Sequence, residues 1–183
     1  MTERLPNRVL IVGGSGAGKS TLATRLAAVS GVPLAELDAW FWGPGWTRRE
    51  AFSAEVAALA AQPRWVAEGS YASALRTLLP RAELVVWLDY PRPLQAWRIV
   101  RRSLRRAWQR ETLAHGNRET LRGALFSRDS LLLWMWRGHG KRRAELSALR
   151  AVCPASWQVF RAPAQTARWL NGLILPEGDG RHD

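Results

Sequence analysis

Cysteine is nearly absent from this 183-residue sequence, whose single thiol is Cys153. One cysteine cannot form a disulfide within the chain, so the pattern is not that of a disulfide-stabilised secreted domain. Long apolar runs are also missing: no stretch approaches the ~20 residues of a membrane-spanning helix, and the first residues lack the apolar segment of a signal peptide. We therefore expect a cytoplasmic protein without a membrane partner.

Lysine is scarce too, because the 27 basic residues include only Lys19 and Lys141. The formal net charge is nevertheless +12, and it is unevenly distributed. Between residues 92 and 143, fourteen basic and three acidic residues leave a net charge of +11. Such a segment can bind the phosphates of a nucleotide or of a nucleic acid. His115 and His139 have no partners at metal-ligand spacing, and we assign them no role.

The length suits one hydrophobic core, so we expect a single domain over residues 1–175 and a flexible tail over 176–183. Apolar runs predict strands at 8–12, 34–38, 64–68, 84–89 and 157–160. Helical spacing predicts helices between them. Strands that alternate with helices favour an α/β fold with a parallel sheet covered on both faces.

Three of these helices carry specific expectations. One begins at Thr47, whose hydroxyl would cap it together with Glu50, after an aromatic and glycine-rich segment that we expect to be a loop. The helix of about 93–109 has Trp97, Val100, Leu104 and Trp108 as its apolar stripe. Two further helices are expected through residues 121–134 and over about 140–151.

Residues 13–20 match the phosphate-binding pattern G-x-x-x-x-G-K-[ST] in full, between a predicted strand and a predicted helix. Glycines allow successive backbone N–H groups to face an anion, and the helix start adds a partial positive charge. Lys19 is expected to reach the β- and γ-phosphates, and the Ser20 hydroxyl to bind magnesium. The sequence therefore predicts a site for a nucleoside triphosphate, ATP with Mg²⁺.

Three carboxylates follow predicted strands and are candidates to hold the hydrated metal or to meet a substrate. Asp89 ends the most apolar strand, Glu68 precedes Gly69, and Asp38 precedes the aromatic segment. Any of them can also be a solvated strand end, and the residue pattern alone leaves the choice open.

Arginines and aromatic residues complete the candidate site. Arg98, Arg102 and Arg105 share one stripe of a helix, and Arg142 and Arg143 open a later one. Fixed cations stabilise the charge of a phosphoryl group in transfer. The aromatic residues that crowd one segment can stack on a base or close over a substrate, or pack in the core; they are Trp40, Phe41, Trp42 and Trp46.

The order of these features resembles the adenylate-kinase-like branch of P-loop kinases, and within it the bacterial proteins known as adenylate kinase-related or DNA topology modulation proteins. The resemblance implies a P-loop NTPase three-layer sandwich with sheet order 2-3-1-4-5 and a helical lid insertion over about 110–137. It implies that Asp38 serves as the base or substrate-side carboxylate and that Glu68 positions magnesium-bound waters. The sequence after Glu68 lacks the arginine that adenylate kinases carry there, which argues against AMP as the acceptor.

We thus assign catalysis to Lys19, Asp38 and Arg102, the metal to Ser20 and, through water, to Glu68, and the acceptor to Asp38, Trp42 and Gly69. The residues expected to bind ATP are Gly13, Gly14, Ser15, Gly16, Ala17, Gly18, Lys19, Ser20, Thr21, Arg98, Arg105 and Arg142. The leading hypothesis is a kinase that transfers the γ-phosphoryl group of ATP to a small acceptor. The alternatives are a nucleotide-regulated protein that binds DNA or RNA and an ATPase without an acceptor.

Overall fold

Five short strands form one parallel sheet in a computed structural model that describes residues 6–109, 111–117, 120, 123, 125 and 130–174. The strands are β1 (Arg8–Gly13), β2 (Leu34–Glu36), β3 (Trp65–Glu68), β4 (Leu84–Leu88) and β5 (Ser156–Phe160). All neighbouring pairs are parallel, and the order is β2-β3-β1-β4-β5. The predicted fold class and sheet order are confirmed.

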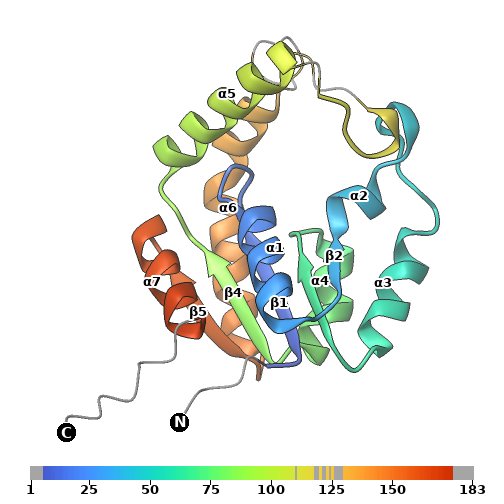
Figure 1. The fold of residues 1–183 in the computed structure, drawn as a ribbon, viewed down its shortest axis with the longest axis vertical. Coiled ribbons are helices and arrows are strands. Elements are labelled where there is room, and N and C mark those ends of the chain that lie inside the picture. The colour runs from blue at the N-terminus through green and yellow to red at the C-terminus, as the bar shows by residue number, and fades with distance from the viewer. Residues whose placement is uncertain are drawn as a thin grey trace, which may run out of the picture.

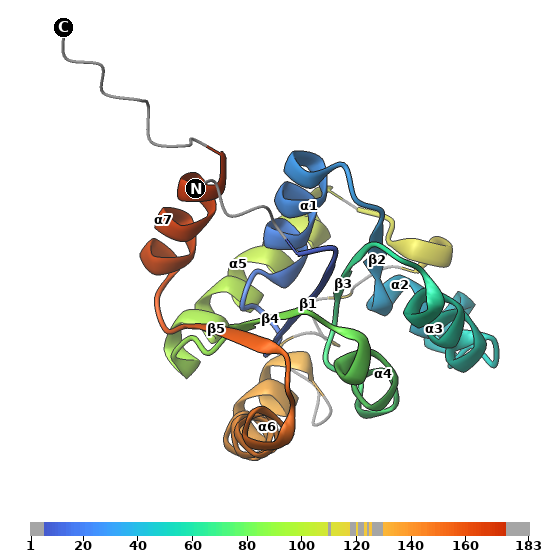
Figure 2. The same cartoon turned by 90° about the horizontal axis from the view of Figure 1, so that it is seen from below.

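Helices cover both faces of this sheet, which explains why residues 9–12 of β1 and all of β4 are apolar. Helices α1 (Lys19–Ser30) and α7 (Pro163–Ile174) lie on one face, and α4 (Ala72–Leu78) and α6 (Leu131–Val152) lie on the other (Figure 2). Alternate strand residues enter two separate cores: Leu10 and Val12 face α3 (Phe52–Ala61), α4 and α6, whereas Val9 and Ile11 face α1 and α7.

Helix α5 (Arg92–Gln109) is placed differently, because it rises above the carboxyl edge of the sheet (Figure 1). Its buried residues are Gln95, Ile99 and Ser103, of which Gln95 and Ile99 face the loop after β1. The predicted apolar stripe is therefore wrong as a core face: Trp97 is 60% exposed, Leu104 52% and Trp108 89%. The helix packs on the glycine-rich backbone of this loop through Gln95 and Ile99, so these side chains, and not the predicted stripe, form its buried face.

The segment after β2 differs from its predicted form. The strand ends at Glu36, and Leu37–Phe41 form the short helix α2, followed by the 3-10 turn η1 (Pro44–Trp46). Thr47 does not cap a helix, because its hydroxyl donates to the carbonyl of Pro44 at 2.9 Å and α3 begins only at Phe52. Arg49, which binds the Trp40 carbonyl and Glu55, holds this folded segment together.

The two helices predicted around residues 121–151 also need correction. One helix, α6, runs from Leu131 to Val152 through Gly138 and Gly140, and the Ser130 side chain caps it. Residues 131–137 of the expected lid therefore belong to its first turns, while residues 110, 118–119, 121–122, 124 and 126–129 lie outside the described residues. The expected tail, 176–183, lies outside them as well.

The remaining short elements are two 3-10 turns, η2 (Leu79–Arg81) and η3 (Ala114–Gly116). Among the described helices, none combines the length and the apolar character needed to span a bilayer.

Candidate functional site

The predicted phosphate-binding loop connects the carboxyl end of β1 to the start of α1. It curls back on itself, since the Ala17 N–H donates to the Gly14 carbonyl at 3.3 Å. Lys19 folds over the loop, with its Nζ 3.2 Å from the same carbonyl. The loop, the ammonium group and the amino end of α1 thus converge where an anion would be bound.

Helix α5 packs directly on this loop. A Cβ atom at Gly16 would lie 2.5 Å from the Gln95 carbonyl oxygen, and Gly16 has φ +77°, so glycine is required there on both counts. Gly14 is in contact with the Gln95 side chain, whose Nε2 donates to the Tyr90 carbonyl at 2.7 Å. Arg98 donates to the Ala17 carbonyl at 2.9 Å, so it lies at the loop, and its contact with ATP stays a prediction.

Ser20 and Glu68 come together beside the loop, although 48 residues separate them. The Ser20 hydroxyl donates to Oε1 of Glu68 at 3.1 Å. Glu68 is 1% exposed, and its other oxygen, Oε2, has no hydrogen-bond partner within the described chain. Burial raises the pKa of Glu68, and the positive charge of Lys19 partly offsets this rise.

This pair fits a hydrated Mg²⁺ ion, because a buried carboxylate oxygen without a donor next to a hydroxyl is a hard oxygen site. The described residues contain no group of three or more His, Cys, Asp or Glu side chains that could hold a metal by themselves. A site with few protein ligands is typical of Mg²⁺ bound to nucleotide phosphates. Glu68 is the one of the three candidate carboxylates for which the described residues show a hydrogen bond to Ser20.

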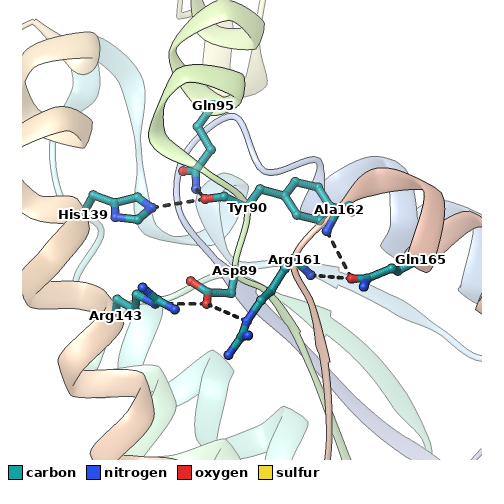
Figure 3. Close-up of polar contacts among 8 residues, drawn as sticks. All are labelled: Asp89, Tyr90, Gln95, His139, Arg143, Arg161, Ala162 and Gln165. Carbon is teal, nitrogen blue, oxygen red and sulfur yellow. Dashed lines mark hydrogen bonds and ion pairs between the residues drawn. The ribbon is translucent and has the colours of Figure 1, made fainter.

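Asp89, the third carboxylate, is engaged elsewhere. Its Oδ2 pairs with Arg143 Nε at 3.0 Å and with Arg161 Nε at 3.9 Å (Figure 3). The carboxylate therefore ties the end of β4 to α6 and to the residue after β5. Arg143, expected among the phosphate-binding cations, forms this ion pair in the structure.

The same junction fixes the start of α5. The Tyr90 carbonyl accepts from Gln95 and lies 3.2 Å from Nε2 of His139, which projects from α6 (Figure 3). Gln165 accepts from the N–H groups of Arg161 and Ala162, so it caps the start of α7. His139 thus has a structural contact that the sequence did not indicate.

Asp38 lies in the first turn of α2, not at a strand end. Its Oδ1 accepts a 2.7 Å hydrogen bond from the Tyr71 hydroxyl. Burial, together with the negative charge of Asp38, raises the pKa of Tyr71 well above its ordinary value. Tyr71 therefore remains a protonated donor, and it is a site residue that sequence reasoning missed; its position just after Glu68-Gly69-Ser70 was the available signal.

Aromatic rings surround this carboxylate–phenol pair. Phe41 stacks on Tyr71 with ring centroids 4.2 Å apart and meets Trp42 edge-on at 4.8 Å. Trp42 in turn contacts Trp46 at 6.0 Å. Trp40 and Phe41 pack against the core, whereas Trp46 is 45% exposed. Core packing thus holds for Trp40 and Phe41, and contact of the aromatic segment with a base or a substrate stays a prediction.

Ser70 connects the phosphate side to the Asp38 side. Its hydroxyl accepts from the Gly13 N–H and donates to the Gly13 carbonyl, both at 3.1 Å. Its own carbonyl accepts from Arg142 at 3.3 Å. Gly69, just before it, lies so close to Leu37 that a Cβ atom would be 2.9 Å from the leucine Cβ.

Arg142 reaches this edge of the sheet from α6. Its guanidinium lies 4.7 Å from the centroid of the Trp134 ring. Burial lowers the pKa of Arg142, while negative charge, including that of Asp38, opposes the shift. Arg142 therefore sits between the phosphate loop and the Asp38 side. A small pocket at this place is lined in part by Gly14, Ser15, Trp134, His139, Arg142 and Arg143.

The other predicted arginines follow Arg98 along α5. Arg102, one turn later, is partly buried. Arg105 has a side chain that is 60% exposed and pairs with Glu111 at 3.6 Å. The structure thus brings Arg98 to the loop and places Arg105 farther out, beside the segment that follows the helix.

Asn117 is a second residue that sequence reasoning missed. It is 6% exposed; its Nδ2 donates to the Gly43 carbonyl at 2.9 Å, and its Oδ1 accepts from the Trp46 N–H at 3.3 Å. His115 Nε2 lies 2.9 Å from the Ala39 carbonyl. The segment after α5 therefore contacts the α2–η1 segment beside Asp38, in a way that no local sequence signal could reveal.

Comparisons with known proteins identify the fold. No protein-family model and no curated protein matches the sequence. Among solved structures, the chain is similar to a shikimate kinase from Acinetobacter baumannii in complex with shikimate, with 21% identity, 96% of each chain covered and a TM-score of 0.56. It is also similar to a gluconokinase from Sinorhizobium meliloti 1021, with 20% identity, coverage of 96% of this chain and 99% of that one, and a TM-score of 0.51. The chain therefore has the fold of these P-loop kinases.

Proposed function

We propose that this protein is a Mg²⁺-dependent kinase that transfers the γ-phosphoryl group of ATP to a hydroxyl group of a small acceptor. One observation carries the proposal: Ser70 joins the phosphate loop, through Gly13, to the side of the sheet edge where Asp38 and Tyr71 lie. A triphosphate site and a carboxylate suited to an acceptor hydroxyl are thus neighbours. The likeness in fold to small P-loop kinases supports the same conclusion.

On the donor side, the loop N–H groups and Lys19 would bind the β- and γ-phosphates, and Arg98 would approach from α5. Ser20 and Glu68 would hold Mg²⁺, Ser20 directly and Glu68 through water. When bound, Mg²⁺ supplies neutralisation of the phosphate charge. Arg102 and Arg105 would contribute positive charge from α5, beside a lid formed by the residues after that helix, in a single domain over residues 1–175.

On the acceptor side, Asp38 would orient the hydroxyl and take its proton, and Tyr71 would hold the carboxylate in place. Trp42 would form part of the aromatic surface around the acceptor, and Gly69 would allow the acceptor to approach the backbone closely. The cation Arg142 favours an acceptor that carries negative charge, because this guanidinium is partly withdrawn from solvent beside Ser70. Because of the order of its motifs, we propose that the protein belongs to the adenylate kinase-related branch of P-loop kinases.

The test is an acceptor screen that measures ADP release by the purified protein with ATP and Mg²⁺. The panel contains nucleosides, nucleotides, sugars, aminoglycosides and hydroxylated carboxylic acids. It includes shikimate and gluconate because two proteins with this fold are a shikimate kinase and a gluconokinase. We expect one class to raise ADP release at least tenfold in the native protein and not in Asp38→Asn. Hydrolysis that no acceptor stimulates would instead identify an ATPase, and absence of ATP binding would end the proposal.

A further inference from the structure

One face of α5 presents large apolar side chains to solvent. Trp97, Leu104 and Trp108 are 60%, 52% and 89% exposed, and Arg101 between them is also exposed. We call these four residues the α5 ridge. Exposed apolar residues that occur singly are ordinary, whereas a continuous row marks a contact surface.

The spacing of the ridge residues places them on one line. Steps of four, three and four residues return to the same side of an α-helix. From Trp97 to Trp108 the line is roughly 16 Å long, at 1.5 Å per residue. The opposite side of the helix holds the buried residues Gln95, Ile99 and Ser103, and the first two of them lie at the phosphate loop. The ridge therefore points away from the candidate site, and the proposed chemistry does not use it.

The charge of α5 restricts what can cover the ridge. The helix contains six arginines and no acidic residue; Arg92, Arg101 and Arg105 are exposed, whereas Arg98 lies at the phosphate loop. A second copy of the ridge would bring like charges together and be repelled. A partner that complements both the arginines and the apolar row must be anionic at its surface and apolar beneath it.

We propose that the α5 ridge docks on a membrane surface containing anionic phospholipids. Tryptophan prefers the boundary between headgroups and acyl chains, and arginine binds headgroup phosphates. Leu104, between the two tryptophans, gains free energy in acyl chains but cannot stack on a base, which argues against single-stranded nucleic acid as the occupant. The sequence predicted no membrane partner because it lacks a spanning segment, but a helix bound at the interface needs none.

The experiment is co-sedimentation of the full chain with vesicles of phosphatidylcholine and phosphatidylserine in a 7:3 ratio, compared with pure phosphatidylcholine. We expect the native protein to sediment only with the anionic vesicles and to be released by salt. The variant Trp97→Ser/Trp108→Ser should lose at least roughly tenfold in vesicle affinity, and Arg101→Gln roughly fivefold. Thermal melting and nucleotide binding show whether each variant is folded.

Matched control variants remove an apolar side chain or a charge from other surfaces of the protein. Val152→Ser deletes an apolar side chain that is 80% exposed on α6, and Arg76→Gln deletes an exposed charge on α4; both should leave binding unchanged. No sedimentation with anionic vesicles at low salt would refute the proposal. An equal loss of vesicle affinity in the control variants would also refute it. Binding of a single-stranded oligonucleotide that depends on the ridge, with no vesicle binding, would replace the lipid by nucleic acid.

Discussion

At the scale of single residues, Glu68 shows most clearly how burial opposes the ionisation of a carboxyl group. Its carboxyl is 1% exposed, one oxygen accepts from Ser20, and the other has no partner in the described chain. Its pKa is raised because burial disfavours the ionised form. The folded state without metal thus binds the proton of this group more tightly than the unfolded state does.

The variant Glu68→Gln should therefore stabilise the metal-free protein while impairing function. With a raised native pKa, ionisation of Glu68 costs stability as pH rises through that pKa, and the cost is absent below the ordinary value of 4.5. We expect the Tm of the variant to exceed that of the native protein at neutral pH and to match it at low pH. Phosphoryl transfer should fall by roughly 10- to 100-fold. Equal Tm values at every pH would contradict this account.

Tyr71 offers a complementary prediction, because its hydroxyl donates to Asp38 and its pKa lies well above the ordinary 10.0. Tyr71→Phe removes the donor without changing the ring that stacks on Phe41. We expect kcat to fall by roughly tenfold, since a hydrogen bond to a charged group is lost.

The pH–rate profile distinguishes this orienting role from proton transfer. Because Tyr71 stays protonated, the profile of Tyr71→Phe should be lower but unchanged in shape up to pH 10. Loss of an alkaline limb in the variant would show that Tyr71 itself titrates during turnover.

At the scale of elements, the contact between η3 and η1 depends on one buried amide. Asn117→Ala removes the acceptor of the Trp46 N–H and the donor to the Gly43 carbonyl. Leaving buried backbone groups unpaired should cost about 1–3 kcal/mol of unfolding free energy. Hydrogen exchange at the Trp46 amide should accelerate, and KM for the acceptor should rise more than KM for ATP.

The comparison variant for this contact is His115→Ala, whose side chain is exposed and lies with Nε2 2.9 Å from the Ala39 carbonyl. It should change exchange at Trp46 far less than Asn117→Ala does. If both variants had the same effect, the buried amide would not be the residue that holds the two elements together.

Elements differed in how well the sequence predicted them, for a physical reason. The strands β1 and β4 and the phosphate loop are specified by contiguous residues, so local patterns were sufficient. The buried side of α5 is determined by the glycine-containing loop on which the helix packs. The helical spacing of its large apolar residues therefore identified the exposed face of the helix and not the buried one. Tyr71 with Asp38, and Asn117 with Gly43, join residues 33 and 74 positions apart, which no local pattern encodes.

At the scale of the whole molecule, a triphosphate that binds the native state should stabilise the entire fold. The loop lies between β1 and α1 and is clamped by α5, so the ligand would contact elements on several sides of the sheet edge. At ATP–Mg²⁺ concentrations about 100 times Kd, linkage adds about 2.7 kcal/mol. For a domain of this size we expect a rise in Tm of roughly 5–10 °C.

Differential scanning fluorimetry with ATP–Mg²⁺ measures this rise, and Lys19→Ala serves as the control. The variant should show the smaller shift expected of weakened phosphate binding, at an unchanged Tm without ligand. A shift of equal size in both proteins would place the nucleotide away from the loop.

Ser70 hydrogen-bonds both backbone groups of Gly13, and its carbonyl receives Arg142. A ligand that orders one side of this serine also orders part of the site for the other. If binding of one substrate increases the affinity of the protein for the other, thermodynamic reciprocity requires that the second increase the affinity for the first by the same factor. Substrate synergism would thus be built into one hydroxyl group, and Ser70→Ala would make the two substrates bind independently of each other.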